Sequence, residues 1–279
     1  MVVVNTRARL AAALSLCVVI LAGLSACATG PKKPPVGTLE PDKFLFERGT
    51  QELDKKHWLT AREYFRELMD SYPQSQYRAD AKLGLADTYL GEGSAESQVL
   101  AINEFREFLS YYPTHKNSYY AQFKLGMAYF YQMHGPDRDQ TETVEAIAEL
   151  TRFVEQYPNS PLIEEGRKRL REARDRKSDA DYRVGFFYLR TGKYPPAAID
   201  RFMAILKNDP EYTHRDAVYF YLAQALIRMR REAEALPYLD RLINEFESSE
   251  HLEDAKKLAD TLKADVAKKA KNGSLSHDS

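Results

Sequence analysis

Helix stops recur along this chain at a fixed distance from the same small and apolar residues. Four of them coincide with a proline that follows an aromatic or acidic residue: Tyr72-Pro73, Tyr112-Pro113, Tyr157-Pro158 and Asp209-Pro210. An alanine lies twelve residues before each proline and a phenylalanine or leucine eight residues before it, namely Ala61 and Phe65, Ala101 and Phe105, Ala146 and Leu150, and Ala198 and Phe202. Residues four apart share one face of a helix, which a proline cannot continue. The pattern therefore predicts a recurring helix with one apolar face.

A second kind of helix, marked by a glycine, precedes each of these. The glycines are Gly49, Gly84, Gly126 and Gly185, and a fifth pair without the proline repeats the spacing through Leu222-Ala223, Leu226, Ala235 and Leu239. Small residues let two helix backbones approach closely, and the larger apolar residue fills the space between successive pairs. Repetition of these offsets predicts an all-α fold, a tetratricopeptide (TPR) superhelix of about five helical hairpins with a C-terminal capping helix.

The repeats are longer than the standard tetratricopeptide unit. Pro73 and Pro113 are 40 residues apart and Pro113 and Pro158 are 45 apart, against roughly 34 in the standard repeat. We assign the excess to segments between helices, around Gly91–Ser97 and Gly135–Thr141.

The predicted organisation has six parts. They are a lipoprotein signal peptide (1–26), a lipidated cysteine with a Pro/Gly-rich tether (27–41), hairpins one and two (42–112), hairpin three (113–160), a long bridging helix with hairpins four and five (161–249), and a capping helix with a frayed tail (250–279).

The bridging helix is expected over Pro161–Arg190, capped by Ser160. Its charged middle, Arg167–Lys177, is expected to lie in solvent. Thr213 and Asp216 match a capping box before hairpin five.

The start of the chain has the features of a secretory signal. Arg7 and Arg9 precede the apolar run Leu10–Leu21, which is short for a membrane span. Leu24-Ser25-Ala26-Cys27 follows and resembles the bacterial lipobox, which implies cleavage before Cys27 and acylation of that residue. The alternatives are an ordinary signal with an incidental cysteine, or an uncleaved helix. The residue after the cysteine is alanine rather than aspartate, which favours the outer membrane.

Composition and spacing give no support to catalysis, a metal or a cofactor. The six histidines are scattered without a pair at metal-ligand spacing, and Cys17, the only other cysteine, lies in the signal. Ser276-His277-Asp278 lies in the predicted frayed tail, where a catalytic triad has no fixed geometry. Lys and Arg number 40 against 41 Asp and Glu, which argues against a nucleic-acid-binding protein. These observations favour a protein that acts by binding.

The string Asp137-Arg138-Asp139-Gln140-Thr141 is the most distinctive short motif. Gly135-Pro136 breaks the preceding helix, and Asp139 with Glu142 fits a capping box for the next one. A loop of mixed charge is also suited to contact a partner. The residues alone leave both interpretations open.

Four strings together resemble one family. Pro113–His115 (PTH), Gly126–Gln132 (GMAYFYQ), Asp137–Thr141 (DRDQT) and Tyr157–Ser160 (YPNS) occur in order on one TPR scaffold behind a lipobox. In this combination the chain resembles the BamD family, the ComL-type lipoproteins of the outer-membrane β-barrel assembly machinery. The resemblance covers essentially the whole mature chain and is strongest from Pro113 to about Leu206.

The resemblance implies a non-enzymatic adaptor, lipid-anchored in the outer membrane and facing the periplasm. Its implied partners are a BamA-like barrel protein with POTRA domains, other lipoproteins of the machinery, and unfolded outer-membrane proteins. Arg201 matches a basic position of the family's fourth repeat, so we assign partner binding to Arg201, with Asp137 and Arg138. Substrate-face candidates are Tyr77, Tyr89, Tyr119 and Tyr120, for each of which a place in the core is the alternative.

Two other functions remain open. One is a different periplasmic TPR lipoprotein, such as a pilus-secretin pilotin or a coordinator of peptidoglycan synthesis. The other is a cell-wall hydrolase or its activator, for which the sequence offers neither paired carboxylates nor a metal constellation.

Overall fold

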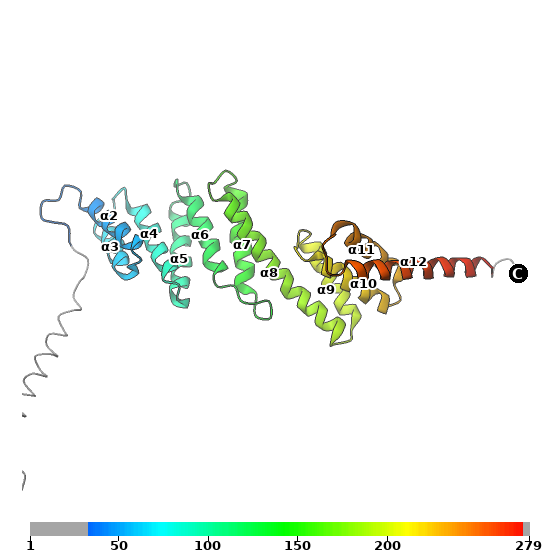
Figure 1. Ribbon diagram of the computed structural model, residues 1–279. Coiled ribbons are helices and arrows are strands. Elements are labelled where there is room, and N and C mark those ends of the chain that lie inside the picture. The colour runs from blue at the N-terminus through cyan, green and yellow to red at the C-terminus, as the bar shows by residue number, and fades with distance from the viewer. Residues whose placement is uncertain (1–32, 276–279) are drawn as a thin grey trace, which may run out of the picture. The chain divides into compact units, whose positions relative to one another are not determined.

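The computed structural model describes residues 33–275, with side chains through residue 265. Within this range the secondary structure is helical and contains no strand, which confirms the all-α prediction (Figure 1). The chain divides into two compact units, one ending at Pro113 and the other beginning at Thr114.

The first unit consists of helices that pack in chain order. Its helices are α2 (Pro41–Asp54), α3 (Trp58–Ser71), α4 (Arg78–Glu92) and α5 (Ala95–Tyr111). Contacts join α2 with α3, α3 with α4, and α4 with α5. These are the consecutive contacts of stacked helical hairpins.

The second unit is organised around one long helix. Its helices are α6 (Ser118–Phe130), α7 (Thr141–Gln156), α8 (Ile163–Arg190), α9 (Pro195–Asn208), α10 (Arg215–Arg228), α11 (Glu232–Glu245) and α12 (Leu252–Leu275). Helix α8 has 28 residues and contacts both α7 and α9. It therefore links the α6–α7 hairpin to the helices that follow (Figure 1).

The core has the small-and-large pairing that the sequence predicts. The ring of Phe65 is fully buried between two glycines, and a Cβ atom would lie 2.6 Å from it at Gly49 and 2.5 Å from it at Gly84. Gly185 meets the ring of Phe202 in the same way, at 2.8 Å. Only a glycine leaves room for the aromatic ring at these contacts, so the prediction of close helix approach is confirmed.

The predicted helix stops are confirmed as well. Tyr72, Tyr112, Tyr157 and Asp209 each cap the C-terminus of a helix immediately before the proline. The backbone N–H of each donates to a carbonyl in the last helical turn, for example from Tyr157 to Phe153 at 2.9 Å. Helix geometry therefore ends where the proline removes the next donor.

Some predicted boundaries are wrong. Helix α8 begins at Ile163 rather than Pro161, because the Ser160 hydroxyl accepts from the backbone N–H of Leu162 in a turn that precedes the helix. Helices α4 and α5 are separated only by Gly93 and Ser94. The extra residues of that repeat therefore lengthen its helices, whereas those of the next repeat do form the α6–α7 loop.

The prediction that the charged middle of α8 lies in solvent holds for Arg167 and Lys168, which are exposed, but not for the residues that follow. Leu170 and Ala173 are buried there. Arg171 forms a bidentate ion pair with Asp209, at 2.8 and 2.5 Å. Arg171 is thus paired with the end of α9 and the loop that follows, and the charge pattern of the helix alone did not indicate this partner.

The same contacts overturn the capping box proposed at Thr213. Helix α10 begins at Arg215, and Thr213 instead donates through its backbone N–H and its hydroxyl to Asp175 of α8, at 3.0 and 2.8 Å. The carboxylate that bonds this threonine therefore comes from another helix rather than from Asp216.

Candidate partner-binding site

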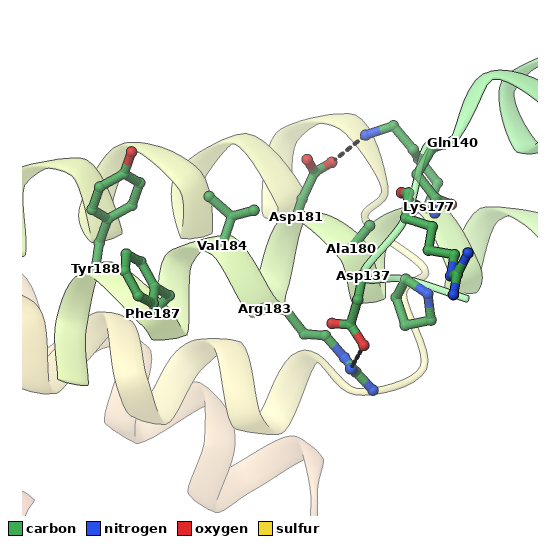
Figure 2. A pocket seen from close by; sticks show the side chains of 11 residues that line it. Asp137, Gln140, Lys177, Ala180, Asp181, Arg183, Val184, Phe187 and Tyr188 are labelled. Carbon is green, nitrogen blue, oxygen red and sulfur yellow. Dashed lines mark hydrogen bonds and ion pairs between the residues drawn. The ribbon is translucent and has the colours of Figure 1, made fainter. Parts of the chain in front are cut away.

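A surface pocket of about 470 Å³ lies between the α6–α7 loop and the C-terminal half of α8. Figure 2 shows charged side chains near the loop and apolar side chains farther along α8. All of its lining residues belong to the second unit: Pro136, Asp137, Arg138, Gln140, Lys177, Ala180, Asp181, Arg183, Val184, Phe187 and Tyr188.

Hydrogen bonds from α8 hold the loop beside the helix. Arg183 pairs with Asp137 at 2.5 Å (Figure 2), and Arg176 donates to the backbone carbonyl of His134 at 2.9 Å. Within the loop, the Gln140 side-chain amide donates to the carbonyls of Gly135 and Arg138, both at 2.9 Å. These contacts give the loop a defined conformation at the edge of the pocket.

The capping box predicted from Asp139 and Glu142 is not formed. Helix α7 begins at Thr141, and its N-cap residue, Gln140, makes no side-chain capping bond. Asp139 Oδ1 accepts instead from the backbone N–H and the hydroxyl of Thr141, both at 2.8 Å. These hydrogen bonds hold the pKa of the Asp139 carboxyl below its ordinary value. Asp139 thus stabilises the loop conformation from the position just before the N-cap residue, Gln140.

The apolar wall of the pocket is a stripe along α8. Ala180, Val184 and Phe187 follow one another at four and three residues, the spacing of one helix face. Ala180 is buried, whereas Val184 is 39% exposed and Phe187 is 52% exposed. A different face of α8, which includes Gly185 and Leu189, packs in the core. The helix therefore has a second apolar face that is open to solvent.

The charges around the pocket are only partly paired. Lys177 binds Asp181 at 2.6 Å (Figure 2). Arg201 of α9 lies 3.7 Å from the same carboxylate, and its side chain is 51% exposed. Arg138 is exposed and forms no ion pair with any of the described residues. Among the charged residues that line the pocket, Arg138 is thus the one without an ion pair to the described residues.

The structure brings the predicted partner-binding residues into one neighbourhood. Asp137 and Arg138 line the pocket. Arg201 does not line it but lies 3.7 Å from Asp181, which does. The sequence reading missed the α8 residues Arg183, Val184 and Phe187. The four- and three-residue spacing of Ala180, Val184 and Phe187 was a visible signal, although an exposed stripe and a core stripe look the same in sequence.

The tyrosines of the first unit differ in their surroundings. Tyr77 is half-buried and stacks on Phe46, with ring centroids 5.2 Å apart. Tyr89 is only 3% exposed, beneath the guanidinium of Arg62, and its hydroxyl accepts a hydrogen bond from Arg66. This burial corrects the prediction for Tyr89, which is a core residue rather than part of an exposed face.

The two candidate tyrosines of the second unit, Tyr119 and Tyr120, are both half-buried. Tyr119 packs against the core cluster that contains Phe123 and Phe153. Tyr120 lies beneath the ammonium group of Lys124, which is 5.2 Å from the ring centroid. Each retains some accessible surface.

The described residues contain no group of three His, Cys, Asp or Glu side chains arranged to hold a metal ion. No helix in the same range has the length and apolar character needed to cross a membrane. Cys27 and the predicted signal peptide lie outside the described residues.

The paired helices and their glycine–aromatic contacts define the molecule as a TPR-type helical-hairpin protein. A solved structure of the TPR2AB domain of yeast Sti1 is similar, with 14% identity and a TM-score of 0.37, covering 80% of this chain and 98% of that one. At this low score, the fold assignment rests on the helix pairs of the chain itself.

Sequence comparison identifies the family. Residues 39–235 match the family model YfiO, described as outer membrane lipoprotein. The outer membrane protein assembly factor BamD of Caulobacter vibrioides is 31% identical over 221 residues, which cover 78% of this chain and 70% of the relative. BamD of Vibrio cholerae is 26% identical, covering 67% of this chain and 79% of the relative. The chain belongs to the BamD (YfiO) family of outer membrane lipoproteins, and the predictions of that resemblance and of a non-enzymatic protein are confirmed.

Proposed function

We propose that this protein is a lipid-anchored periplasmic scaffold of the outer-membrane β-barrel assembly machinery. The observation that carries the proposal is the match of most of the chain to a family whose relatives are named outer membrane protein assembly factors. The TPR architecture supports it, because stacked helical hairpins offer extended binding surfaces. The protein works by binding, without a cofactor.

The anchor is the acylated amino-terminal Cys27 of the mature chain. It is supported by the order of basic residues, apolar core and Leu24–Cys27 at the chain start, and by the description of the family as lipoproteins. Residues 1–26 are the removed signal, and residues 27–41 are the tether that separates the folded units from the outer membrane. Several acyl chains give firm attachment, since each buried methylene contributes about 0.8 kcal/mol.

The second unit binds the POTRA region of a BamA-like barrel protein. Support comes from the meeting of Asp137, Arg138 and Arg201 around one pocket with exposed apolar residues. Arginine beside an accessible apolar surface is a frequent composition of binding hot spots. Other lipoproteins of the machinery are further partners of the scaffold.

Unfolded outer-membrane proteins are the substrates, received on first helices of the hairpins. The accessible aromatic candidates are Tyr77, Tyr119 and Tyr120, since Tyr89 is buried. Half-buried tyrosines suit such a role because the packed part of the ring fixes its position while its polar edge remains available.

The test is a mild-detergent pull-down of the tagged lipoprotein from its own cell envelope, followed by mass spectrometry. We expect near-stoichiometric recovery of a barrel protein with POTRA domains. Arg201→Glu should weaken the affinity for that protein about tenfold, the equivalent of 1.4 kcal/mol, and so reduce its recovery. Arg167→Glu, which alters an exposed arginine on α8 outside the pocket, is the matched control.

Cell fractionation tests the anchor, and the pull-down tests the alternatives. Cys27→Ser should release the protein into the soluble periplasmic fraction, and retention on membranes at high salt would contradict the lipid anchor. Recovery of a secretin or a peptidoglycan synthase in place of a barrel protein would overturn the assembly role.

A further inference from the structure

The apolar stripe of α8 lies beside a loop that the helix itself holds in position. Phe187 and Val184 are accessible, while Asp137 and His134 of the loop are bonded to Arg183 and Arg176. A pocket with one apolar wall and one ordered polar edge can accept a side chain and orient the backbone that carries it.

The charge of the polar edge specifies what it can accept. Both carboxylates of the pocket, Asp137 and Asp181, have cationic partners, at 2.5 and 2.6 Å. Arg138 has no carboxylate partner among the described residues. A guanidinium presents a rigid fork of donors that matches a carboxylate. The pocket therefore offers an accessible guanidinium close to accessible apolar side chains, a combination that suits a negative charge next to an apolar group.

We propose that this pocket is a docking site for an extended protein segment in which a carboxylate side chain adjoins a bulky apolar side chain. Arg138 binds the carboxylate, and Val184 and Phe187 cover the apolar group. Gln140 holds the backbone of Arg138 through its 2.9 Å hydrogen bond and so fixes where this side chain leaves the loop. The inference rests on the proposed function in one respect: the segment belongs to a protein of the assembly pathway.

Charge complementarity favours this occupant over the other candidates. A basic segment would face the unpaired Arg138 and the exposed Arg201, and like charges at an interface disfavour binding. A purely apolar segment would cover Phe187 but would bury charge without pairing it. The mixed segment satisfies both ends of the pocket.

The experiment is a titration of the purified mature protein against short fluorescein-labelled peptides, read by fluorescence anisotropy. The probe peptide carries one Glu-Phe pair in a Gly/Ser background, and its matched forms carry Gln-Phe, Lys-Phe or Glu-Ser. We expect saturable binding of the Glu-Phe peptide and about tenfold weaker binding of each of the others.

Variants assign the interaction to the pocket. Arg138→Gln should weaken binding of the Glu-Phe peptide about tenfold. It should leave binding of the Gln-Phe peptide unchanged, because that peptide has no carboxylate for Arg138 to bind. Phe187→Ser should weaken every peptide that contains phenylalanine. Controls are Arg167→Gln, also an exposed arginine, and Val144→Ser, which replaces an apolar residue of α7 that is 49% exposed and outside the pocket.

Each outcome decides the proposal. No saturable binding of the Glu-Phe peptide, equal binding of all four peptides, or an unaltered affinity in Arg138→Gln would overturn it. Circular dichroism of each variant confirms folding, and the charge-reversed pair of Arg138→Glu with the Lys-Phe peptide should regain affinity. Failure of the peptides with the barrel protein still recovered would overturn the pocket alone, whereas loss of the barrel protein with peptide binding intact would overturn the proposed function.

Discussion

The third and fourth proline-terminated helices of the chain end in the same geometry but are stabilised by different chemistry. At the end of α7, Tyr157 packs against Phe153, with ring centroids 6.2 Å apart, and Phe153 also meets Phe123 at 5.4 Å. At the end of α9 the corresponding residue is Asp209, whose carboxylate is bound by Arg171 and by the Ser178 hydroxyl. We call these the aromatic junction and the ionic junction.

The difference shows that one repeat position serves two kinds of contact. The backbone N–H of both residues donates to a carbonyl of the preceding turn, so the helix stop is common to the two junctions. The aromatic junction depends on buried apolar area, which does not require a particular partner. The ionic junction depends on a partner 38 residues earlier in the chain, and it fixes where the α9–α10 loop meets α8.

The largest expected effect is at the aromatic junction. Phe153→Ala removes a fully buried ring and leaves a cavity, so it should lower the free energy of unfolding by about 3–5 kcal/mol. Chemical denaturation followed by circular dichroism measures the change. Phe187→Ala is the control, because its ring is half exposed. Equal losses in the two variants would show that the ring of Phe153 contributes no packing.

Removal of the cation at the ionic junction should have the next largest effect. Arg171→Ala leaves the carboxylate of Asp209, a residue 7% exposed, without its ion pair, which should lower the free energy of unfolding by about 3 kcal/mol. Arg167→Ala on the same helix should cost far less, because both members of its pair are exposed.

A double variant sharpens the comparison. Arg171→Leu with Asp209→Tyr converts the ionic junction toward the aromatic one and should be more stable than Arg171→Ala alone, since the buried carboxylate of Asp209 is removed together with its cation. If the double variant is as unstable as Arg171→Ala, aromatic packing cannot replace the ion pair at the end of α9.

The smallest expected effect is a dependence on acid. Burial by itself raises the pKa of the Asp209 carboxyl, but the hydrogen bonds from Arg171 and Ser178 and the charge of Arg171 outweigh it and hold the pKa below its ordinary value. The folded state therefore binds this proton less readily than the unfolded state does. The contribution to stability is present above the ordinary aspartate pKa of about 4 and is lost as the pH falls through the folded pKa.

Thermal unfolding between pH 7 and pH 3 tests this dependence. The melting temperature of the unaltered protein should fall more steeply on acidification than that of Asp209→Asn. Tyr157→Phe at the aromatic junction serves as the control and should retain the full acid dependence. If the melting temperature depends on pH identically in the unaltered protein and in Asp209→Asn, then Asp209 does not contribute to the loss of stability in acid.

Much of the fold could be predicted because its information is local and periodic. The offsets from each proline identified the alanine and phenylalanine positions, and the glycines opposite Phe65 and Phe202 marked where helices approach closely. The errors at Ser160, Asp139 and Thr213 share one cause. Each hydroxyl or carboxylate has several backbone or side-chain partners within reach, and the capping pattern specifies only one of them.

The candidate site was predicted in part. Asp137, Arg138 and Arg201 were chosen through resemblance to a family, and the structure places them around one pocket. Val184 and Phe187 were missed, because an apolar stripe does not state whether another helix covers it. Tyr89 was a substrate-face candidate with a core position as the alternative, and its burial beneath Arg62 decides for the core.

The sequence by itself determined the helical repeat, its stops and its close contacts, because these follow from periodicity and from the size of single side chains. Tertiary structure alone decided which charges are paired and which apolar face stays open. Asp209 meets Arg171, and Asp137 meets Arg183, across long separations in the chain. Such pairs depend on how helices stack. The position of a charged residue in the sequence does not show which distant residue it pairs with.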